Sequence, residues 1–359
     1  MTVGQVGRGG RALALLAAAA LAGAAGCARE AGGSTPAQDD GGIVHVVCGA
    51  TEEWCAATTA QFTRSTGVKA DFVRLSSGEA LARIKAGKNN PEFDVWYGGP
   101  ADGFAAAGGE GLLEPYVSPN AAAIPARYKD PGGMWTGVYV GALGFCANTK
   151  VLAEKGVAAP ASWADLLDPK LAKDISIAHP STSGTAYTAL WTQVVLGGGG
   201  AAGEDKAMQY MRKLHPNVLQ YTKSGAAPAQ MAARGEVAVG VIFSHDCVAA
   251  REGGFPDLAV SFPSEGTGYE TGGVALVKGA QNPVSAKKYV DWALTTEAQE
   301  VGPTVKAYQF PTNPGAKVSD KVVDLSQIKL VEYDPVVAGK AKSALTKRFD
   351  IDVAQAPKS

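Results

Sequence analysis

The sequence lacks an excess of charge of either sign. Of its 359 residues, 33 are lysine or arginine and 34 are aspartate or glutamate, so the formal net charge is −1. No protein-wide basic field is available to hold a nucleic acid, and any bound anion must be held by local groups. Charged residues are 19% of the chain and apolar residues 46%. This balance excludes a disordered chain and allows a core large enough for two packed lobes.

Motifs of catalysis and of metal binding are also missing. The chain has four histidines and contains no Gly-x-Ser-x-Gly elbow, no His-Glu-x-x-His pair and no Walker loop. Ser183, His245 and Asp246 could be combined into a nucleophilic triad, but adjacent His and Asp side chains at a strand end point in divergent directions. There is no Cys-x-x-Cys, and His245 and Cys247 have no further ligand near them in sequence. We predict a protein that is not an enzyme and that uses no cofactor and no resident metal.

The N-terminal 41 residues are typical of an exported lipoprotein. Two arginines precede an uncharged, alanine-rich run over residues 12–26, which is shorter than the roughly 20 residues that a spanning helix needs. The run ends in LAGAAGC, which is similar to a bacterial lipobox. This similarity implies a signal peptide over residues 1–26 and a lipidated Cys27 at the start of a flexible tether over residues 27–41. We expect a lipid anchor on the outer face of the cytoplasmic membrane, with secretion to the periplasm as the alternative.

Four further cysteines remain in the exported part of the chain. In an oxidising compartment an even number of cysteines indicates disulfides, and four cysteines allow three pairings. We favour a Cys48–Cys55 bond across a strand-to-helix turn and a Cys146–Cys247 bond between two strands of one lobe. Four small, buried, unpaired side chains are the alternative.

After the tether, strand patterns alternate with helical patterns, which is typical of an α/β fold with a largely parallel sheet. Strands are predicted over residues 43–48, 68–75, 93–97, 137–146, 175–178, 237–243 and 272–277. Helices are predicted over residues 52–65, 78–86, 163–167, 185–196, 204–214, 285–295 and 333–348. Because ligands bind at the carboxyl ends of strands in such sheets, the segments that follow the strands are the places to look for a site.

The segment PSTSGTA over residues 180–186 is the strongest candidate for an anion site. It joins a predicted strand to the most regular predicted helix, where free backbone N–H groups and the helix dipole can hold a phosphate or carboxylate. Plain helix capping would explain one hydroxyl but not several. The candidate residues are Ser181, Thr182, Ser183, Gly184 and Thr185.

Other candidates follow the ends of predicted strands. Ser76 and Glu79 fit a capping box that would leave the Ser77 hydroxyl free, so capping and ligand contact are both open there. His245 and Asp246 end a buried apolar strand, where two polar side chains need partners from a ligand or from a neighbouring backbone. Glycines flank Glu270 in a segment typical of a hinge. The remaining candidates after strand ends are Thr51, Glu52, Trp54, Gly78 and Gly99.

Several segments together resemble the solute-binding proteins of bacterial ABC importers, in the branch labelled iron(III)-binding. The matching segments are DVWYGGPADGF, GVYVGALGF, HPSTSGTAYTAL, QYTKSGAAP, GEVAVGVIFSHD and PSEGTGYETGGVALVKGAQNP. The resemblance implies a two-lobe, type II periplasmic-binding-protein fold. It also implies a monomeric, hinge-closing receptor that delivers a small solute to a membrane permease.

Within this branch, the pattern is closest to the members that bind hexose phosphates. Ferric-binding members use adjacent tyrosines, and this chain has no Tyr-Tyr pair among its 11 tyrosines. The resemblance assigns the hydroxyls and backbone of residues 181–185 to the phosphate, and His245, Asp246 and Glu270 to the sugar hydroxyls. In a related branch that binds 2-aminoethylphosphonate, an acid would meet the amine. A ferric receptor and a secreted enzyme are the alternative functions.

The resemblance also implies that the chain crosses between the lobes, near Tyr139 and Glu270. We expect lobe 1 over residues 42–138 and 270–314, and lobe 2 over residues 139–269 and 315–359. The ligand would bind in the cleft between them.

Overall fold

The structure, a computed structural model, describes residues 41–355, which belong to one compact unit of the chain. The predicted signal peptide, Cys27 and nearly all of the predicted tether lie outside the described residues. Within residues 41–355, no helix is both long and apolar enough to cross a membrane.

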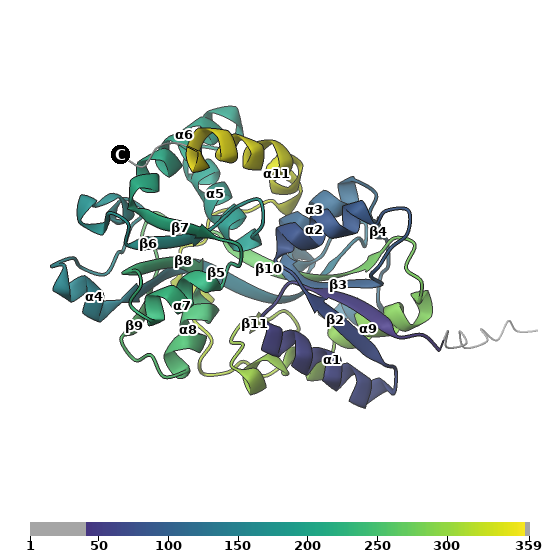
Figure 1. Ribbon diagram of the computed structural model, residues 1–359. Coiled ribbons are helices and arrows are strands. Elements are labelled where there is room, and N and C mark those ends of the chain that lie inside the picture. Colours follow the sequence, from purple (N-terminus) through teal and green to yellow (C-terminus); the bar gives the residue numbers. More distant parts are fainter. Residues whose placement is uncertain (1–40, 356–359) are drawn as a thin grey trace, which may run out of the picture. The chain divides into compact units, whose positions relative to one another are not determined.

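Strands and helices alternate as the sequence predicts, and the strands form one mixed sheet in the order β2-β1-β3-β10-β5-β8-β6-β7 (Figure 1). The strands are β1 (Val44–Cys48), β2 (Ala70–Arg74), β3 (Val95–Pro100), β4 (Leu113–Glu114), β5 (Thr136–Asn148), β6 (Ile175–Ala178), β7 (Val218–Thr222), β8 (Val239–Phe243), β9 (Leu258–Ser261), β10 (Tyr269–Val277) and β11 (Phe310–Pro311). β4 pairs with β10, whereas β9 and β11 pair with β5. The strands at the two ends of the order pair in parallel, whereas β5 and β10 run antiparallel to their neighbours.

The helices pack against this sheet, and most lie where the sequence predicts them. They are α1 (Glu52–Thr66), α2 (Ser77–Ala86), α3 (Ala101–Gly109), α4 (Thr149–Glu154), α5 (Gly184–Leu196), α6 (Gly200–Leu214), α7 (Ala227–Ala233), α8 (Ser244–Glu252), α9 (Pro283–Ala293), α10 (Thr296–Gln299) and α11 (Pro335–Phe349). The helix predicted over residues 163–167 is only a short 3₁₀ turn, Asp165–Leu167.

β5 links the two parallel groups of strands. Its 13 residues are all buried. The first half, up to Ala142, pairs with β10 and β11, and the second half, from Leu143, pairs with β8 and β9. Because β5 is buried along its whole length and pairs with strands of both groups, it joins the two groups into one sheet.

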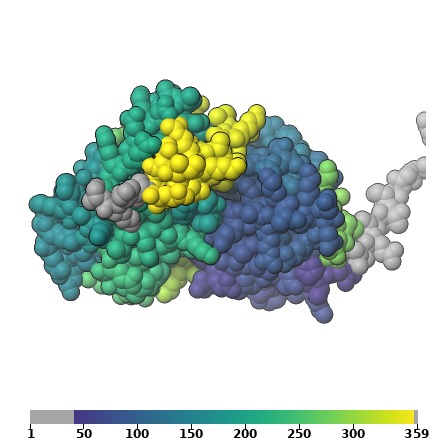
Figure 2. Space-filling model, turned by 45° about the horizontal axis from the view of Figure 1, so that its top comes forward, coloured from purple at the N-terminus to yellow at the C-terminus, as the bar shows by residue number. Residues whose placement is uncertain are grey.

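The C-terminal helix α11 packs against α3, a helix from the N-terminal part of the chain. Figure 1 shows α11 beside α3, and Figure 2 shows the same contact from outside, with the yellow helix against the blue segment. The same helix also contacts α5, and the Tyr187 hydroxyl of α5 donates a 2.6 Å hydrogen bond to the carbonyl of Ala338. Helix α11 therefore contacts both α3 and α5, two helices that lie far apart in the sequence.

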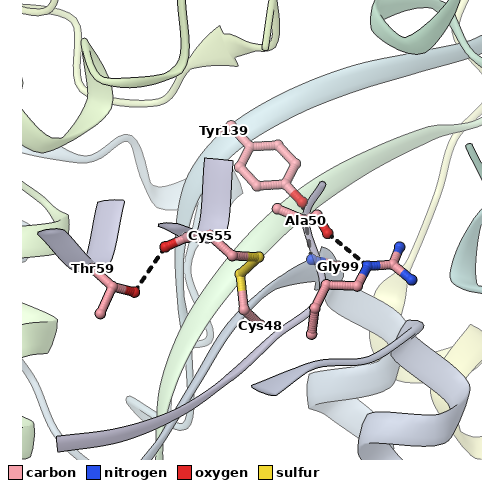
Figure 3. Close-up of a disulfide and its surroundings, with 7 residues drawn as sticks. Cys48, Ala50, Cys55, Thr59, Gly99 and Tyr139 are labelled. Atoms are coloured by element: carbon pink, nitrogen blue, oxygen red, sulfur yellow. Dashed lines mark hydrogen bonds between the residues drawn. A yellow bond between two sulfur atoms is a disulfide. The ribbon is translucent and has the colours of Figure 1, made fainter. Parts of the chain in front are cut away.

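Both disulfides that the sequence favours are present. Cys48 at the end of β1 bonds to Cys55 in α1, next to Tyr139 and Gly99 (Figure 3). Cys146 in β5 bonds to Cys247. The expectation that the second bond joins two strands is wrong, because Cys247 lies in helix α8. A short strand-to-helix connection brings the start of α8 against β5.

Candidate functional site

A polar cavity lies where several strands end and several helices begin. Its lining comes from both groups of strands and from both halves of the chain. The lining residues are Gly49, Ala50, Thr51, Arg74, Ser76, Ser77, Gly99, Pro100, Tyr139, Ser183, Gly184, Thr185, Gly225, Ala226, Phe243, His245, Asp246, Glu270 and Gln309.

One wall of the cavity is built from the beginnings of helices. Thr51, Ser76, Pro100, Ser183 and Phe243 are the N-cap residues of α1, α2, α3, α5 and α8, and all five line the cavity. The first turns of helices carry free N–H groups and the positive end of the helix dipole. Such a wall attracts anions without any formal charge.

The starts of helices α2 and α5 approach each other closely at this wall. The backbone N–H of Gly78 donates a 2.9 Å hydrogen bond to the carbonyl of Thr182. A side chain at Gly78 would place its Cβ 2.1 Å from the carbonyl oxygen of Ser181, so only glycine fits this contact. A Cβ at Gly184 would lie 2.5 Å from Pro100 and 3.1 Å from the Ser77 hydroxyl. The helix starts of α2 and α5 are therefore in direct contact beside the cavity.

Arg74 supplies the formal positive charge of the cavity. It is the last residue of β2, and its guanidinium donates to the carbonyl of Ala50 at 3.1 Å, to the Ser76 hydroxyl at 3.4 Å and to the Ser224 hydroxyl at 3.3 Å. All three partners are uncharged, so the positive charge of Arg74 is oriented but not paired by them. A planar guanidinium held in this way suits a phosphate or phosphonate group.

A second group of polar side chains consists of His245, Asp246 and Glu270. The His245 Nε2 atom lies 3.8 Å from an Asp246 oxygen and 3.7 Å from a Glu270 oxygen. These distances are too long for hydrogen bonds. All three side chains are close to fully buried, and the Nδ1 atom of His245 has no hydrogen-bond partner within the described part of the chain. A buried polar group of this kind needs hydrogen-bond partners.

Burial shifts the pKa of each member of this group. Burial raises the pKa of Asp246 to about 7, although the nearby Arg74 opposes the shift. Burial, and then the charges of Asp246 and Asp102, raise the pKa of Glu270 well above its usual range. Burial lowers the pKa of His245 to about 3. At neutral pH, His245 is therefore neutral and Asp246 is near its titration midpoint, while the upward shift favours the protonated form of Glu270, which both donates and accepts hydrogen bonds.

Tyr139 closes the cavity beside these acids. Its hydroxyl accepts a 2.9 Å hydrogen bond from the backbone N–H of Gly99, which is in a left-handed conformation with φ 97° (Figure 3). Burial and the charge of Glu270 raise the pKa of Tyr139 well above its usual range, so the side chain stays a neutral phenol.

The structure brings together most of the residues that the sequence singles out. The predicted residues that line the cavity are Thr51, Ser76, Ser77, Gly99, Ser183, Gly184, Thr185, His245, Asp246 and Glu270. Glu52 is exposed and is not among the lining residues. Trp54 is packed in the core, with its ring 4.8 Å from that of Tyr139. Gly78 and Ser181 line a separate groove beside α11, and Thr182 lines neither the cavity nor this groove.

Three local expectations are corrected. Ser76 is the N-cap of α2 but its side chain makes no capping hydrogen bond, so the capping box with Glu79 does not form. His245 and Asp246 do not end a strand: they lie in the first turn of α8, directly after β8. The strand predicted to stop at Tyr97 continues through Gly98 and Gly99 to Pro100. These two glycines have positive φ angles, and they carry the strand end into the cavity.

Sequence reasoning missed three side chains of the cavity, namely Arg74, Tyr139 and Gln309. Arg74 was the most accessible to sequence analysis, because it is the cation nearest to the Ser76–Ser77 turn in the strand that precedes it. The other missed lining residues are Gly49, Ala50, Pro100, Gly225, Ala226 and Phe243, which contribute mainly backbone or apolar surface.

Comparison with known proteins identifies the class to which this fold and cavity belong. Residues 91–336 match the family model described as "Bacterial extracellular solute-binding protein". The chain therefore belongs to this family of bacterial extracellular solute-binding proteins. It is a solute-binding protein of an ABC importer with the two-lobe, type II periplasmic-binding-protein fold, as the sequence resemblance implied. Such proteins bind a small solute and interact with a permease.

Three relatives are the most informative. The periplasmic binding protein AfuA from Actinobacillus pleuropneumoniae, solved with fructose-6-phosphate bound, is 43% identical, covers 88% of this chain and 99% of its own, and has a TM-score of 0.84. The periplasmic binding protein P5PA is 33% identical, with coverage of 87% and 99% and a TM-score of 0.81. A putative 2-aminoethylphosphonate-binding periplasmic protein from Salmonella typhimurium is 27% identical, over 68% of this chain and 70% of that protein.

Proposed function

We propose that this protein captures a small phosphorylated or phosphonylated solute in the cavity, delivers it to the permease unchanged and catalyses no reaction. The observation that carries this proposal is the pairing of two kinds of site in one cavity. Helix starts, hydroxyls and Arg74 form an anion-binding wall, and a buried acid–histidine group lies beside it. The relative solved with fructose-6-phosphate and the relative described as phosphonate-binding both support this ligand class.

The anionic group of the solute belongs at the anion-binding wall. Ser183 caps α5 by accepting a 3.4 Å hydrogen bond from the backbone N–H of Ala186, so its own proton is available to a ligand. Ser77 and Thr185 add hydroxyls, and Arg74 adds a full positive charge. Ser181 and Thr182 point to other surroundings: the Thr182 hydroxyl donates to the carbonyl of His179. We therefore assign the anion to Ser77, Ser183, Gly184 and Thr185 together with Arg74.

The organic part of the solute belongs at His245, Asp246 and Glu270. A neutral Glu270 can both donate and accept hydrogen bonds, and Asp246 accepts them, which matches the hydroxyls of a sugar. An ammonium group would instead find two carboxyl groups within reach. We favour a sugar phosphate, because the neutral Glu270 and His245 suit hydroxyl groups better than a cation.

We further propose the organisation that the sequence implies around this site. Lobe 1 spans residues 42–138 and 270–314, lobe 2 spans residues 139–269 and 315–359, and closure of the cleft traps the solute. Cys27 carries a lipid that anchors a monomer outside the cytoplasmic membrane. Labelling of the protein with radioactive palmitate, in cells that carry the wild-type chain or Cys27→Ala, tests the anchor. Equal labelling of the two proteins would refute it.

Binding of ferric iron is the second candidate. It is disfavoured because Tyr139 is the one tyrosine among the lining residues and its hydroxyl accepts a backbone hydrogen bond, whereas a ferric site needs several hard oxygen ligands. An absorbance scan separates the two candidates. A visible phenolate-to-iron band on adding ferric citrate supports the ferric site, and its absence together with binding of a hexose phosphate supports the proposal.

Calorimetric titration with a hexose 6-phosphate and with inorganic phosphate tests which residues bind the anion and which bind the organic part of the solute. Ser183→Ala removes one hydrogen bond to a charged group and should weaken both ligands about tenfold. Asp246→Ala removes an acceptor for sugar hydroxyls but also relieves repulsion with the phosphate. It should strongly weaken the hexose phosphate and leave inorganic phosphate unchanged or tighter. Equal effects of Asp246→Ala on the two ligands would remove Asp246 from the sugar subsite.

A further inference from the structure

The segment that leads into β11 also lines the cavity, through Gln309. Phe310 and Pro311 of β11 pair with Val140 and Tyr139 of β5. The Thr312 hydroxyl donates a 2.7 Å hydrogen bond to the carbonyl of Gly137. The segment is thus held to the central strand immediately after Gln309, and Gln309 lines the same cavity as Tyr139 of that strand.

Gln309 is a polar lining residue to which the proposed function gives no role. Its side chain is buried, with 8% of the residue exposed, and its Oε1 atom has no hydrogen-bond partner within residues 41–355. A buried amide oxygen without a partner is costly, because it has lost its hydrogen bonds to water. The cavity is the place where this oxygen can find a donor.

Gln299, a second buried glutamine close to this segment, has a structural role and serves as a comparison. Gln299 is 7% exposed, and its Oε1 atom accepts a 2.7 Å hydrogen bond from the backbone N–H of Asn313. Its Nε2 atom donates to the Thr312 hydroxyl at 3.1 Å. Gln299 therefore stabilises the segment from within, whereas Gln309 contributes an unused acceptor to the cavity.

We propose that Gln309 is a specificity-determining ligand contact, whose side-chain oxygen accepts a hydrogen bond from a hydroxyl on the organic part of the solute. This inference rests on the proposed function. An acceptor oxygen is repelled by phosphate oxygens, and the anion already has Arg74, serine hydroxyls and backbone N–H groups as donors. An uncharged amide adds direction without adding another negative charge to a cavity that holds two carboxyl groups. Gln309 therefore selects among sugar phosphates by the position of a hydroxyl.

The test is calorimetric titration of wild type, Gln309→Ala, Gln309→Met and Gln299→Ala with a hexose 6-phosphate, its monodeoxy analogues and inorganic phosphate. Both Gln309 variants should bind the hexose phosphate about five- to twentyfold more weakly, with inorganic phosphate unchanged. For one monodeoxy analogue, wild type and Gln309→Ala should bind equally, because the partner hydroxyl is gone. Gln299→Ala should lower the melting temperature and leave the ratio of the two affinities unchanged.

The outcomes separate this inference from the proposed function. If wild type binds the hexose phosphate and both folded Gln309 variants bind it equally well, Gln309 is not a ligand contact. An equal loss for inorganic phosphate would place the amide at the anion and overturn the assignment to a hydroxyl. A wild-type protein that binds neither anion refutes the proposed function and the inference with it. The methionine variant keeps the side-chain volume, which guards against a failure to fold.

Discussion

Asp102 and Asp246 are both buried carboxylates, but their surroundings differ. Asp102, in the first turn of α3, accepts a 2.7 Å bond from the Lys342 ammonium and a 3.0 Å hydrogen bond from the Tyr333 hydroxyl. The Lys342 ammonium also lies 3.7 Å from the centre of the Tyr187 ring. This cluster joins α3 to the C-terminal helix and α5, so its charges are compensated within the protein.

Asp246, by contrast, has no cation at hydrogen-bond distance in the described part of the chain. Its neighbour His245 is kept neutral by burial, and Arg74 acts only through the longer-range effect that opposes the rise in the pKa of Asp246. The comparison of Asp102 with Asp246 shows that a buried carboxylate can have either of two roles. A compensated charge contributes to the architecture, and an uncompensated one is held ready for a ligand.

The largest effect should follow from removing the cation of the compensated cluster. Lys342→Met leaves the buried Asp102 without its charge partner, and should lower the free energy of unfolding by about 3–5 kcal/mol. Denaturant titration of the purified protein measures this loss. Lys340→Met, on the exposed face of the same helix, is the matched control and should change little. A loss for Lys342→Met as small as that of the control would show that the ion pair is not compensating Asp102.

A smaller effect, on binding rather than on stability, is expected at Arg74. Arg74→Ala removes the formal positive charge of the anion-binding wall, and should weaken a hexose phosphate and inorganic phosphate alike by about 10- to 100-fold. Arg83→Ala is the control, since Arg83 forms an exposed ion pair with Glu92 and is not among the lining residues. Unchanged affinities in Arg74→Ala would move the anion away from the end of β2.

The smallest effect concerns pH and separates the two carboxylates directly. Folded Asp246 has a pKa of about 7 against 3.8 ordinarily. Between these values the folded protein keeps a proton that the unfolded chain releases, so stability falls as pH rises toward and through 7. Glu270 acts in the same direction, and His245 acts in the opposite direction only below about pH 6.5. Without ligand, Asp246 alone should lower the free energy of unfolding by about 0.7 kcal/mol from pH 6.5 to 7.5.

Asp246→Asn tests whether this slope belongs to the cavity. The amide cannot titrate, so the fall between pH 6.5 and 7.5 should be clearly smaller than in wild type, as measured by denaturant titration at each pH. Asp71→Asn, at an exposed carboxylate that pairs with His45, is the control. Identical slopes in wild type and Asp246→Asn would show that Asp246 is already ionised in the folded protein below pH 6.5.

Much of the site could be read from the sequence, because its anion-binding wall is made of local structure. A strand end followed by Ser, Thr and Gly before a helix predicts an N-terminus with free N–H groups, and Ser183 does cap α5. The Cys48–Cys55 bond is local in the same sense, since its seven-residue separation spans one turn. The capping box at Ser76 does not form although its residues fit, and the Ser76 hydroxyl instead accepts a 3.4 Å hydrogen bond from the Arg74 guanidinium.

What the sequence by itself determined is therefore the alternation of strands and helices and the chemistry of each helix start. These depend on residues a few positions apart, whose preferences act before the chain is packed. Only the tertiary structure decided that Arg74, Tyr139 and Gln309 meet at one cavity, and that Trp54 packs in the core while Glu52 faces solvent. Such contacts join residues that lie far apart in the chain. The geometry of β5 and β10 and the close approach of α2 to α5 select them, and no short-range pattern encodes that geometry.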